Sequence, residues 1–269
     1  MKVVLFCGGL GLRLHPSTES IPKPLVKVGG QPVLLHLMKY YSYFGHKDFV
    51  LCLGYKGEEI KKFFLEYDEC FSGDFVLSNG KRKEKLFKSE IEDWTITFAE
   101  TGLKATLGDR LRAVEKYVNS EERFLANYSD GLTDLFLPSL IDFSMRKGKI
   151  ACLITVKPSV AFHYVSTDKR GYVTSIRQLN QTPVRINGGF FVFKNQIFDY
   201  IEPGEDLVYE PFLRLIKQNE LIAYKYDGFW ASLDTYKDKQ RLDELASKND
   251  SFWEIWNKKK QEFGDKKNV

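Results

Sequence analysis

The sequence contains few cysteines, and no two of them are spaced as a paired motif. There is no C-x-x-C pair, and three of the four cysteines lie in apolar runs such as VVLFC and LCL. Such positions are typical of buried, reduced thiols, which indicates a reducing compartment and not a disulfide-stabilised secreted domain. The four residues are Cys7, Cys52, Cys70 and Cys152.

Long apolar runs are also missing. None approaches the roughly 18 residues that a membrane-spanning helix requires. The first residues lead directly into a short apolar run, without the charged and then apolar pattern of a secretory signal peptide. We therefore expect a cytoplasmic protein with no membrane partner.

Positive charge is not gathered into a block. The chain has 40 Lys and Arg against 36 Asp and Glu, a net charge of +4, and the two signs alternate. A nucleic-acid-binding protein usually concentrates its positive charge on one stripe, so nucleic acid is not an expected partner. The small excess fits a few phosphate-binding cations, or it has no functional meaning.

Apolar and aromatic residues are plentiful, at 43% and 14% of the 269 residues. A chain of this length and composition can bury a full core without disulfides or metals. We expect a single α/β domain over residues 1–269.

Strand and helix patterns alternate in the first half. A buried strand is predicted at 2–7, a helix from Pro32 to Gly45, a strand at 48–54 and a helix at 58–67. Repeated strand–helix units predict a doubly wound, mainly parallel, Rossmann-like sheet. The pattern continues with a strand at 94–100, a helix at 107–118 and a strand at 124–128. Ligands of such sheets bind beyond the carboxyl ends of the strands, so we expect the loops there to share one crevice.

Two parts of the chain do not follow this alternation of strands and helices. Residues 70–93 contain Asn79-Gly80, a strong hairpin signal, and predict a projecting β-arm that serves as a lid or an oligomer contact. The second half predicts a mixed-sheet extension that completes the pocket, followed by a helix and a lysine-rich tail over 236–269. Its strands are expected at 150–156, 172–176, 189–193 and 221–226.

The strongest chemical signal is the glycine loop after the first strand. Glycines there let backbone N–H groups approach phosphate oxygens. Arg13 supplies a forked cation, and Lys23, ten residues later, a mobile one. Leu14 breaks the dinucleotide pattern and no G-K-[ST] follows, so we predict a triphosphate site of another kind. The alternative is a glycine turn beside incidental cations.

Five segments in this order, GGLGLRL, IPKPL, YSDGLTD, INGGFFV and GFWASLDT, resemble the sugar-nucleotide pyrophosphorylase superfamily, and glucose-1-phosphate cytidylyltransferases in particular. The likeness covers nearly the whole chain. It implies a homo-oligomeric nucleotidyltransferase that joins a nucleoside triphosphate, expected to be CTP, to a sugar 1-phosphate, expected to be glucose 1-phosphate, and releases pyrophosphate. Residues 1–135 would then form the nucleotide-binding half and 136–235 the sugar-binding half.

The resemblance also assigns roles on the nucleotide side. Arg13 would grip the outgoing phosphates, and Lys23 would sit on the α-phosphate; with Asp130 they form the expected catalytic set. Arg110 would lie near the nucleotide, or else it is an exposed helix arginine paired with an acid. The backbone cradle would comprise Gly8, Gly9, Leu10 and Gly11, with Ser129 beside it.

Asp130 and Asp234 match the family's metal-binding aspartates. Two carboxylates from distant loops suit Mg²⁺, which prefers oxygen ligands. For Asp130, in an Asp-Gly pair, the alternative is a plain turn.

On the sugar side, the resemblance implies that a polar loop binds hydroxyl groups while two aromatic residues wall the sugar or the base. The loop is Asn187, Gly188 and Gly189, and the aromatic residues are Tyr128 and Trp230, which could equally be core residues.

The chain departs from the family at one position. A Glu-Lys-Pro motif usually precedes the INGG loop, and its lysine binds the sugar phosphate, but Gln178 stands at that position here. Arg177 is adjacent, although neighbouring strand residues face opposite sides. Arg185 is a second candidate cation, and His163 a weaker one.

Three alternatives therefore stay open. A metal-dependent glycosyltransferase would share the architecture but would hold a diphosphate. A homologue could bind nucleotide without catalysis. The same chemistry could also use UTP or dTTP, or another phosphate or phosphonate acceptor.

Overall fold

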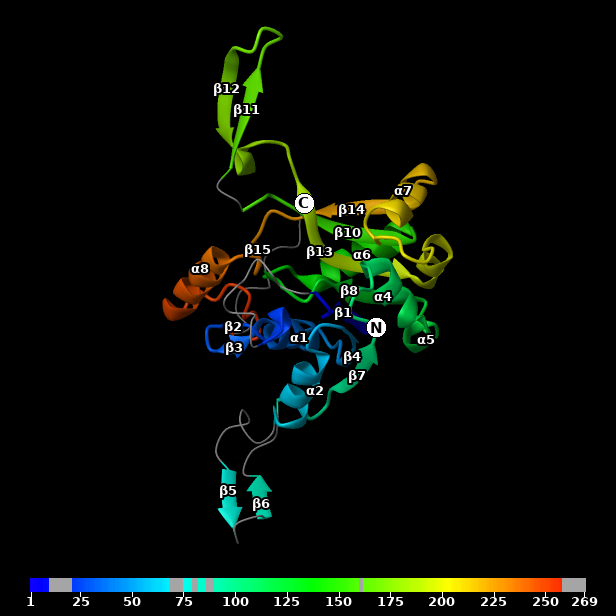
Figure 1. Ribbon diagram of the computed structural model, residues 1–269, viewed down its shortest axis with the longest axis vertical. Helices are drawn as coiled ribbons and strands as arrows, with labels where there is room; N and C mark the ends of the chain where they lie inside the picture. Colours follow the sequence, from blue (N-terminus) through cyan, green and yellow to red (C-terminus); the bar gives the residue numbers. More distant parts are fainter. Residues whose placement is uncertain (10–20, 68–74, 79–81, 86–89, 160–161, 258–269) are drawn as a thin grey trace.

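The computed structural model describes residues 1–9, 21–67, 75–78, 82–85, 90–159 and 162–257. Within them, one sheet of seven strands forms the centre of the molecule (Figure 1), in the order β14-β10-β13-β8-β1-β4-β7. The strands are β1 (Val3–Phe6), β4 (Asp48–Leu53), β7 (Thr95–Glu100), β8 (Arg123–Asn127), β10 (Ala151–Val156), β13 (Ile186–Lys194) and β14 (Leu221–Lys225).

The sheet is mainly parallel, as the sequence predicts. β7, β4, β1 and β8 pair in parallel, and so do β10 and β14. β13 runs antiparallel to both of its neighbours, β8 and β10. This one reversed strand joins the two parallel groups, so three of the four strands expected in the mixed-sheet extension, β10, β13 and β14, belong to the same sheet.

Helices cover both faces of the sheet. Successive residues of β1 face opposite sides, Val3 and Leu5 into one core cluster and Val4 and Phe6 into the other. The first cluster contains α1 (Val33–Tyr43), α2 (Gly57–Leu65) and α6 (Leu137–Lys147), and the second contains α4 (Leu107–Ala113), α5 (Glu115–Val118), η4 (Asn195–Tyr200) and α7 (Glu210–Lys217). The doubly wound α/β fold is thus confirmed.

One predicted helix is interrupted. The pattern at 107–118 predicts a continuous helix, but the backbone at Val114 (φ −104°, ψ 2°) separates α4 from α5. Val114 is fully buried, so the apolar pattern that predicts one helix continues through the residue at which the helix is interrupted.

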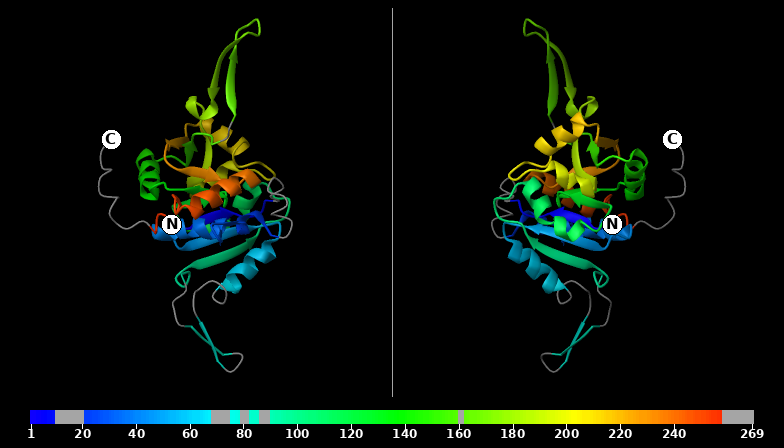
Figure 2. Two further views of the ribbon diagram at one scale, coloured as in Figure 1. Left: turned by 90° about the vertical axis from the view of Figure 1, so that its left-hand side faces the viewer. Right: turned by 90° about the vertical axis from the view of Figure 1, so that its right-hand side faces the viewer.

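Two hairpins project from opposite ends of the body (Figures 1 and 2). β5 (Phe75–Ser78) pairs antiparallel with β6 (Arg82–Lys85), which confirms the hairpin predicted in the β-arm. β11 (His163–Thr167) pairs with β12 (Val173–Gln178) at the other end. The strand predicted at 172–176 therefore lies in this second arm and not in the main sheet.

Several smaller elements complete the structure. They are η2 (Lys23–Leu25), β2 (Lys27–Val28), β3 (Gln31–Pro32), β9 (Gly131–Thr133), η3 (Leu179–Gln181), β15 (Trp230–Ser232) and α8 (Tyr236–Ser247). α8 begins at a capping box in which Thr235 and Asp238 bond each other's backbone N–H groups. Among the described residues, no helix combines the length and apolar character needed to cross a membrane.

A buried histidine joins the C-terminal segment to α1. His36 is 1% exposed, and its Nε2 lies 2.9 Å from the Val28 carbonyl while Trp253 Nε1 donates to its Nδ1 at 3.3 Å. Both contacts are satisfied by a neutral ring with the proton on Nε2. Burial lowers the pKa of His36 below its usual 6.5, against the opposing effects of the Val28 carbonyl and Glu254.

Acidification should therefore destabilise the fold through His36. Its folded pKa is below the unfolded value of 6.5, so the unfolded chain takes up the proton first and stability falls as pH drops below that value. We expect the free energy of unfolding to fall more between about pH 8 and about pH 5 in the wild-type protein than in His36→Gln. Denaturant titrations at both pH values measure this difference, and equal losses in the two proteins would contradict it.

Candidate active site

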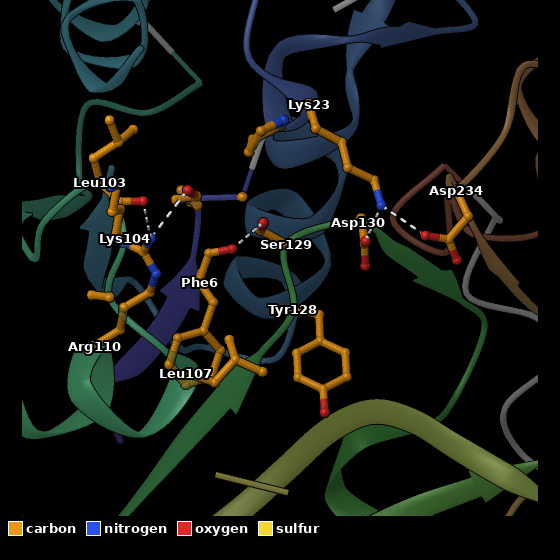
Figure 3. Close-up of a pocket in the computed structure, with 15 residues that line it drawn as sticks. Phe6, Lys23, Leu103, Lys104, Leu107, Arg110, Tyr128, Ser129, Asp130 and Asp234 are labelled. Carbon is orange, nitrogen blue, oxygen red and sulfur yellow. Dashed lines mark hydrogen bonds and ion pairs between the residues drawn. The ribbon is translucent and has the colours of Figure 1, made fainter. Parts of the chain in front are cut away.

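A cavity of about 640 Å³ opens beyond the carboxyl ends of β1, β7 and β8 (Figure 3). Gly8 and Gly9 line it after β1, and Ser129 and Asp130 line it after β8. The two loops that the sequence predicts at one crevice therefore do share it. The remaining lining residues include Lys23, Arg110 and Asp234.

A second cavity of about 360 Å³ adjoins the first. Lys23, Tyr128, Asp130 and Asp234 line both cavities. The second is otherwise bordered by residues of the INGG loop and the β15 strand, including Asn187, Gly188 and Trp230. The two sets of residues predicted for nucleotide and sugar thus meet at a shared wall.

A lysine and two aspartates form that wall. Lys23 Nζ lies 2.5 Å from Asp130 Oδ2 and 2.9 Å from Asp234 Oδ1 (Figure 3). Their side chains are 16%, 19% and 32% exposed. Burial alone would lower the pKa of Lys23, but the two carboxylates outweigh it and raise the pKa, so the ammonium stays charged.

Local backbone geometry brings the two aspartates together. Ser129 adopts a left-handed conformation (φ 63°), and its hydroxyl donates to the Phe6 carbonyl at 2.7 Å, which ties the end of β8 to the end of β1. β15 pairs with β9, and the Leu233 N–H donates to the Asp130 carbonyl at 3.0 Å. Asp234, the next residue, is thereby held beside Asp130.

The sugar-side loop is fixed by its own polar groups. Asn187 Nδ2 donates to the Tyr128 hydroxyl at 2.8 Å, and Asn187 Oδ1 accepts from the Gly189 N–H at 2.9 Å. Trp230 Nε1 donates to the Gly188 carbonyl at 2.8 Å. Gly189 has φ +74°, and a Cβ there would lie 2.5 Å from the Tyr128 ring, so glycine is required. Both aromatic residues therefore line the cavity and hold its loop.

Arg110 lies under the first cavity and not on the surface. It is 4% exposed, and its guanidinium bonds the backbone where β1 and β4 end, so the alternative of an exposed arginine paired with an acid is wrong. Whether it touches the nucleotide stays a prediction. The part of the loop containing Leu10, Gly11 and Arg13 lies outside the described residues, and their roles stay predictions as well.

The structure does not bring Arg177 to the site. Arg177 is exposed on β12 in the projecting hairpin and lines neither cavity. The same holds for His163 on β11. Arg185 donates to the Thr155 and Tyr226 carbonyls and pairs with Asp227 at 2.8 Å, which commits its guanidinium elsewhere. Among the described residues lining the second cavity, the cation is Lys23.

Sequence reasoning missed the loop after β7. Lys104 and Ala105 line the first cavity together with Leu103. The position of this loop could have predicted its role, because it follows the carboxyl end of a parallel strand, where ligands of such sheets bind. Ser159 and Ser232 of the second cavity carried no comparable signal.

Comparison with known proteins identifies the fold and the family. Residues 2–238 match the family model described as nucleotidyl transferase. The chain belongs to the nucleotidyl transferase family. The predicted superfamily is thus confirmed, and the match covers every residue of the Lys23–Asp130–Asp234 wall.

Relatives of this nucleotidyl transferase include two cytidylyltransferases. The chain is 38% identical over 258 residues to the glucose-1-phosphate cytidylyltransferase of Salmonella typhimurium, covering 95% of this chain and 100% of that one. It is 34% identical, with the same coverage, to the probable glucose-1-phosphate cytidylyltransferase of Bacillus subtilis. These relatives agree with the branch that the sequence motifs resemble.

Solved structures share the architecture of this nucleotidyl transferase at low identity. A putative glucose-1-phosphate thymidylyltransferase from Bacillus anthracis, in complex with sucrose, aligns with a TM-score of 0.65 and 18% identity, covering 91% of this chain and 95% of that one. HddC from Yersinia pseudotuberculosis, complexed with GMP-PN, aligns with a TM-score of 0.62 and 21% identity, covering 90% and 98%. Both support the Rossmann-like fold.

Removing the shared ammonium should cost stability. In Lys23→Met, Asp130 and Asp234 would face each other without the Lys23 ammonium between them, and we expect the free energy of unfolding to fall by about 1–3 kcal/mol. The partial exposure of all three side chains keeps this below the range for a fully buried pair. Denaturant titration measures it, and Lys23→Met/Asp130→Asn is the matched control because it removes one of the repelling charges. A control no more stable than Lys23→Met would contradict the electrostatic cause.

Proposed function

We propose that this protein transfers a nucleotidyl group from a nucleoside triphosphate to a sugar 1-phosphate and releases pyrophosphate. CTP and glucose 1-phosphate are the proposed pair, in keeping with the names of the 34–38% identical relatives. The observation that carries the proposal is the position of Lys23, between two acids and at the wall common to two adjoining cavities. A reaction between two phosphate compounds needs its charge-neutralising groups at such a junction.

The cavities suit the two substrates differently. The first is bordered by the Gly8-Gly9 backbone and is the proposed triphosphate site, with Arg13 gripping the outgoing phosphates. The second is bordered by Asn187 and Trp230, and polar and aromatic groups of this kind suit a sugar. Under this proposal residues 1–135 serve mainly the nucleotide and 136–235 mainly the sugar.

The reaction needs no general base. A phosphate monoester is largely ionised near neutral pH, so an oxygen of the sugar 1-phosphate can attack the α-phosphorus directly. A bond forms between that oxygen and the α-phosphorus, and the bond from the α-phosphorus to the β-bridging oxygen breaks, so that pyrophosphate leaves with the electron pair. Catalysis then consists of positioning and charge neutralisation by this chain's cations.

The two aspartates fit a divalent cation. Their oxygens converge on one cation, the Lys23 ammonium, which supports the proposal of a shared cation site. Oxygen ligands of this kind match Mg²⁺, which when bound would neutralise charge on the phosphate oxygens. Lys23 is the residue proposed to neutralise charge at the α-phosphate. We also propose that the enzyme is cytoplasmic and that it forms a homo-oligomer.

If Lys23 and Mg²⁺ use the same oxygens, removing the ammonium should favour the metal. In nucleotide-free protein, we expect Mg²⁺ to raise the melting temperature of Lys23→Met more than that of the wild type. The double variant Lys23→Met/Asp234→Asn is the control and should lose most of this gain, since one ligand is missing. A thermal shift that is equal in all three proteins would argue against a metal site at this wall.

Pyrophosphate release gives the direct test of function. Of all combinations in a matrix of CTP, UTP and dTTP against several sugar 1-phosphates, we expect CTP with glucose 1-phosphate to be fastest. Lys23→Ala should lower turnover by about two to four orders of magnitude while the fold is retained, because it removes charge neutralisation at the reacting centre. Its circular dichroism spectrum is the folding control.

Other outcomes of this assay distinguish the alternatives. Nucleotide binding without turnover on any acceptor would favour a non-catalytic homologue. Turnover with another base or acceptor would keep the chemistry and correct the substrates. Near-normal pyrophosphate release by Lys23→Ala would remove Lys23 from the mechanism.

A further inference from the structure

The ends of three neighbouring parallel strands meet at one buried guanidinium. Arg110 Nη1 donates to the Leu53 carbonyl at 3.1 Å and to the Thr101 hydroxyl at 2.7 Å. Its Nη2 donates to the Gly8 carbonyl at 3.1 Å and to the Leu103 carbonyl at 3.5 Å (Figure 3). Leu53 ends β4, Gly8 follows β1 and Thr101 follows β7, so one side chain from α4 holds all three strand ends.

These contacts leave no terminal N–H of Arg110 for a ligand. A guanidinium has five N–H donors, four of them on Nη1 and Nη2. All four have acceptors in the protein. A phosphate could bind the Nη atoms only by displacing a backbone carbonyl or Thr101, which would undo the contacts that hold the strand ends.

Thr101 completes the cluster without lining either cavity. Its hydroxyl accepts from Arg110 and donates to the Leu53 carbonyl at 2.6 Å, so both hydrogen-bonding capacities point inward. Its backbone N–H donates to the same carbonyl at 3.1 Å. Thr101 can therefore be altered without touching a bound nucleotide.

Two glycines make room for the guanidinium. A Cβ on Gly8 would lie 2.1 Å from Arg110 Nη1, and its three nearest atoms would all belong to that guanidinium. A Cβ on Gly54 would lie 2.8 Å from the same Nη1 and 2.9 Å from the Gly8 Cα. Neither distance is possible for real atoms without movement. The position of Arg110 thus requires glycine at the first position of the loop.

We propose that Arg110 is a positioning residue, which fixes the start of the glycine loop through Gly8 and Thr101 and so presets the backbone for phosphate. The proposal rests on the proposed function, because it takes the first cavity as the triphosphate site. Preorganised backbone donors do not have to be ordered when the ligand binds, and affinity gains accordingly.

Thr101→Val tests this contact network with almost no change in shape. The substitution removes both hydroxyl contacts, and we expect the Kd for CTP to rise about tenfold while the KM for glucose 1-phosphate stays within about twofold. Thr101→Ser keeps the hydroxyl and should restore CTP affinity to within about twofold of the wild type. Amide exchange of residues 6–9 in nucleotide-free protein should be faster in Thr101→Val and near wild type in Thr101→Ser. Unchanged CTP affinity and unchanged exchange in a folded Thr101→Val would overturn the proposal.

Arg110→Lys separates geometry from charge. A lysine keeps the positive charge but cannot reach four acceptors with a planar fork, so a positioning role predicts a loss of CTP affinity at least as large as that of Thr101→Val. Wild-type CTP affinity in a folded Arg110→Lys would overturn the proposal in favour of a purely electrostatic role. This variant also decides the question if Thr101→Val does not fold.

Failure of the proposed function would look different. A wild-type protein that bound no nucleoside triphosphate and released no pyrophosphate would refute that function. In that case the amide exchange of residues 6–9 still reports on the strand ends. Equal exchange rates in Thr101→Val and in the wild type would show that Arg110 and Thr101 do not fix the strand ends.

Discussion

One ammonium group between two carboxylates links three separated segments of this protein at the two adjoining cavities. Lys23, Asp130 and Asp234 come from three separated stretches of the chain, and each enters the wall from a different element. This arrangement persists because the elements that carry the three side chains are themselves fixed. The strand pairing of β15 with β9 and the Ser129 contact to β1 provide that constraint. All three residues line both cavities, so the two cavities share this wall.

The mixed order of the sheet explains why one wall can serve two compartments. Parallel strands β1, β4, β7 and β8 deliver their carboxyl ends to the glycine side, where loops can carry ligand-binding groups. The reversed strand β13 lies next to β8, so it brings Asn187 and the glycines after it alongside Tyr128. A parallel strand in that place would have presented its carboxyl end and not this segment. The sugar-side loop is therefore a product of the one reversal in strand direction.

Buried cations play two different parts in this architecture. Lys23 contacts carboxylates and remains partly open to both cavities, which suits a group that exchanges partners during a reaction. Arg110 contacts carbonyls and a hydroxyl at the ends of strands, and it is almost completely enclosed. A planar group with several fixed donors can join many carbonyls at once, whereas a flexible ammonium can move. The residue types thus follow from whether the site needs a fixed frame or a mobile charge.

The amino-acid sequence by itself determined the alternation of strands and helices, because local apolar patterns at β1, α1 and β4 report directly on burial. It also predicted the hairpin that pairs β5 with β6, since Asn-Gly is a strong hairpin signal, and the motifs indicated Lys23, Asp130 and Asp234 through resemblance. Only the tertiary structure decided which distant groups meet. It placed Arg177 on a projecting hairpin, away from both cavities, and it enclosed Arg110 among strand ends. Neither outcome can be predicted from the local sequence pattern, because strand pairing and side-chain burial depend on residues far apart in the chain.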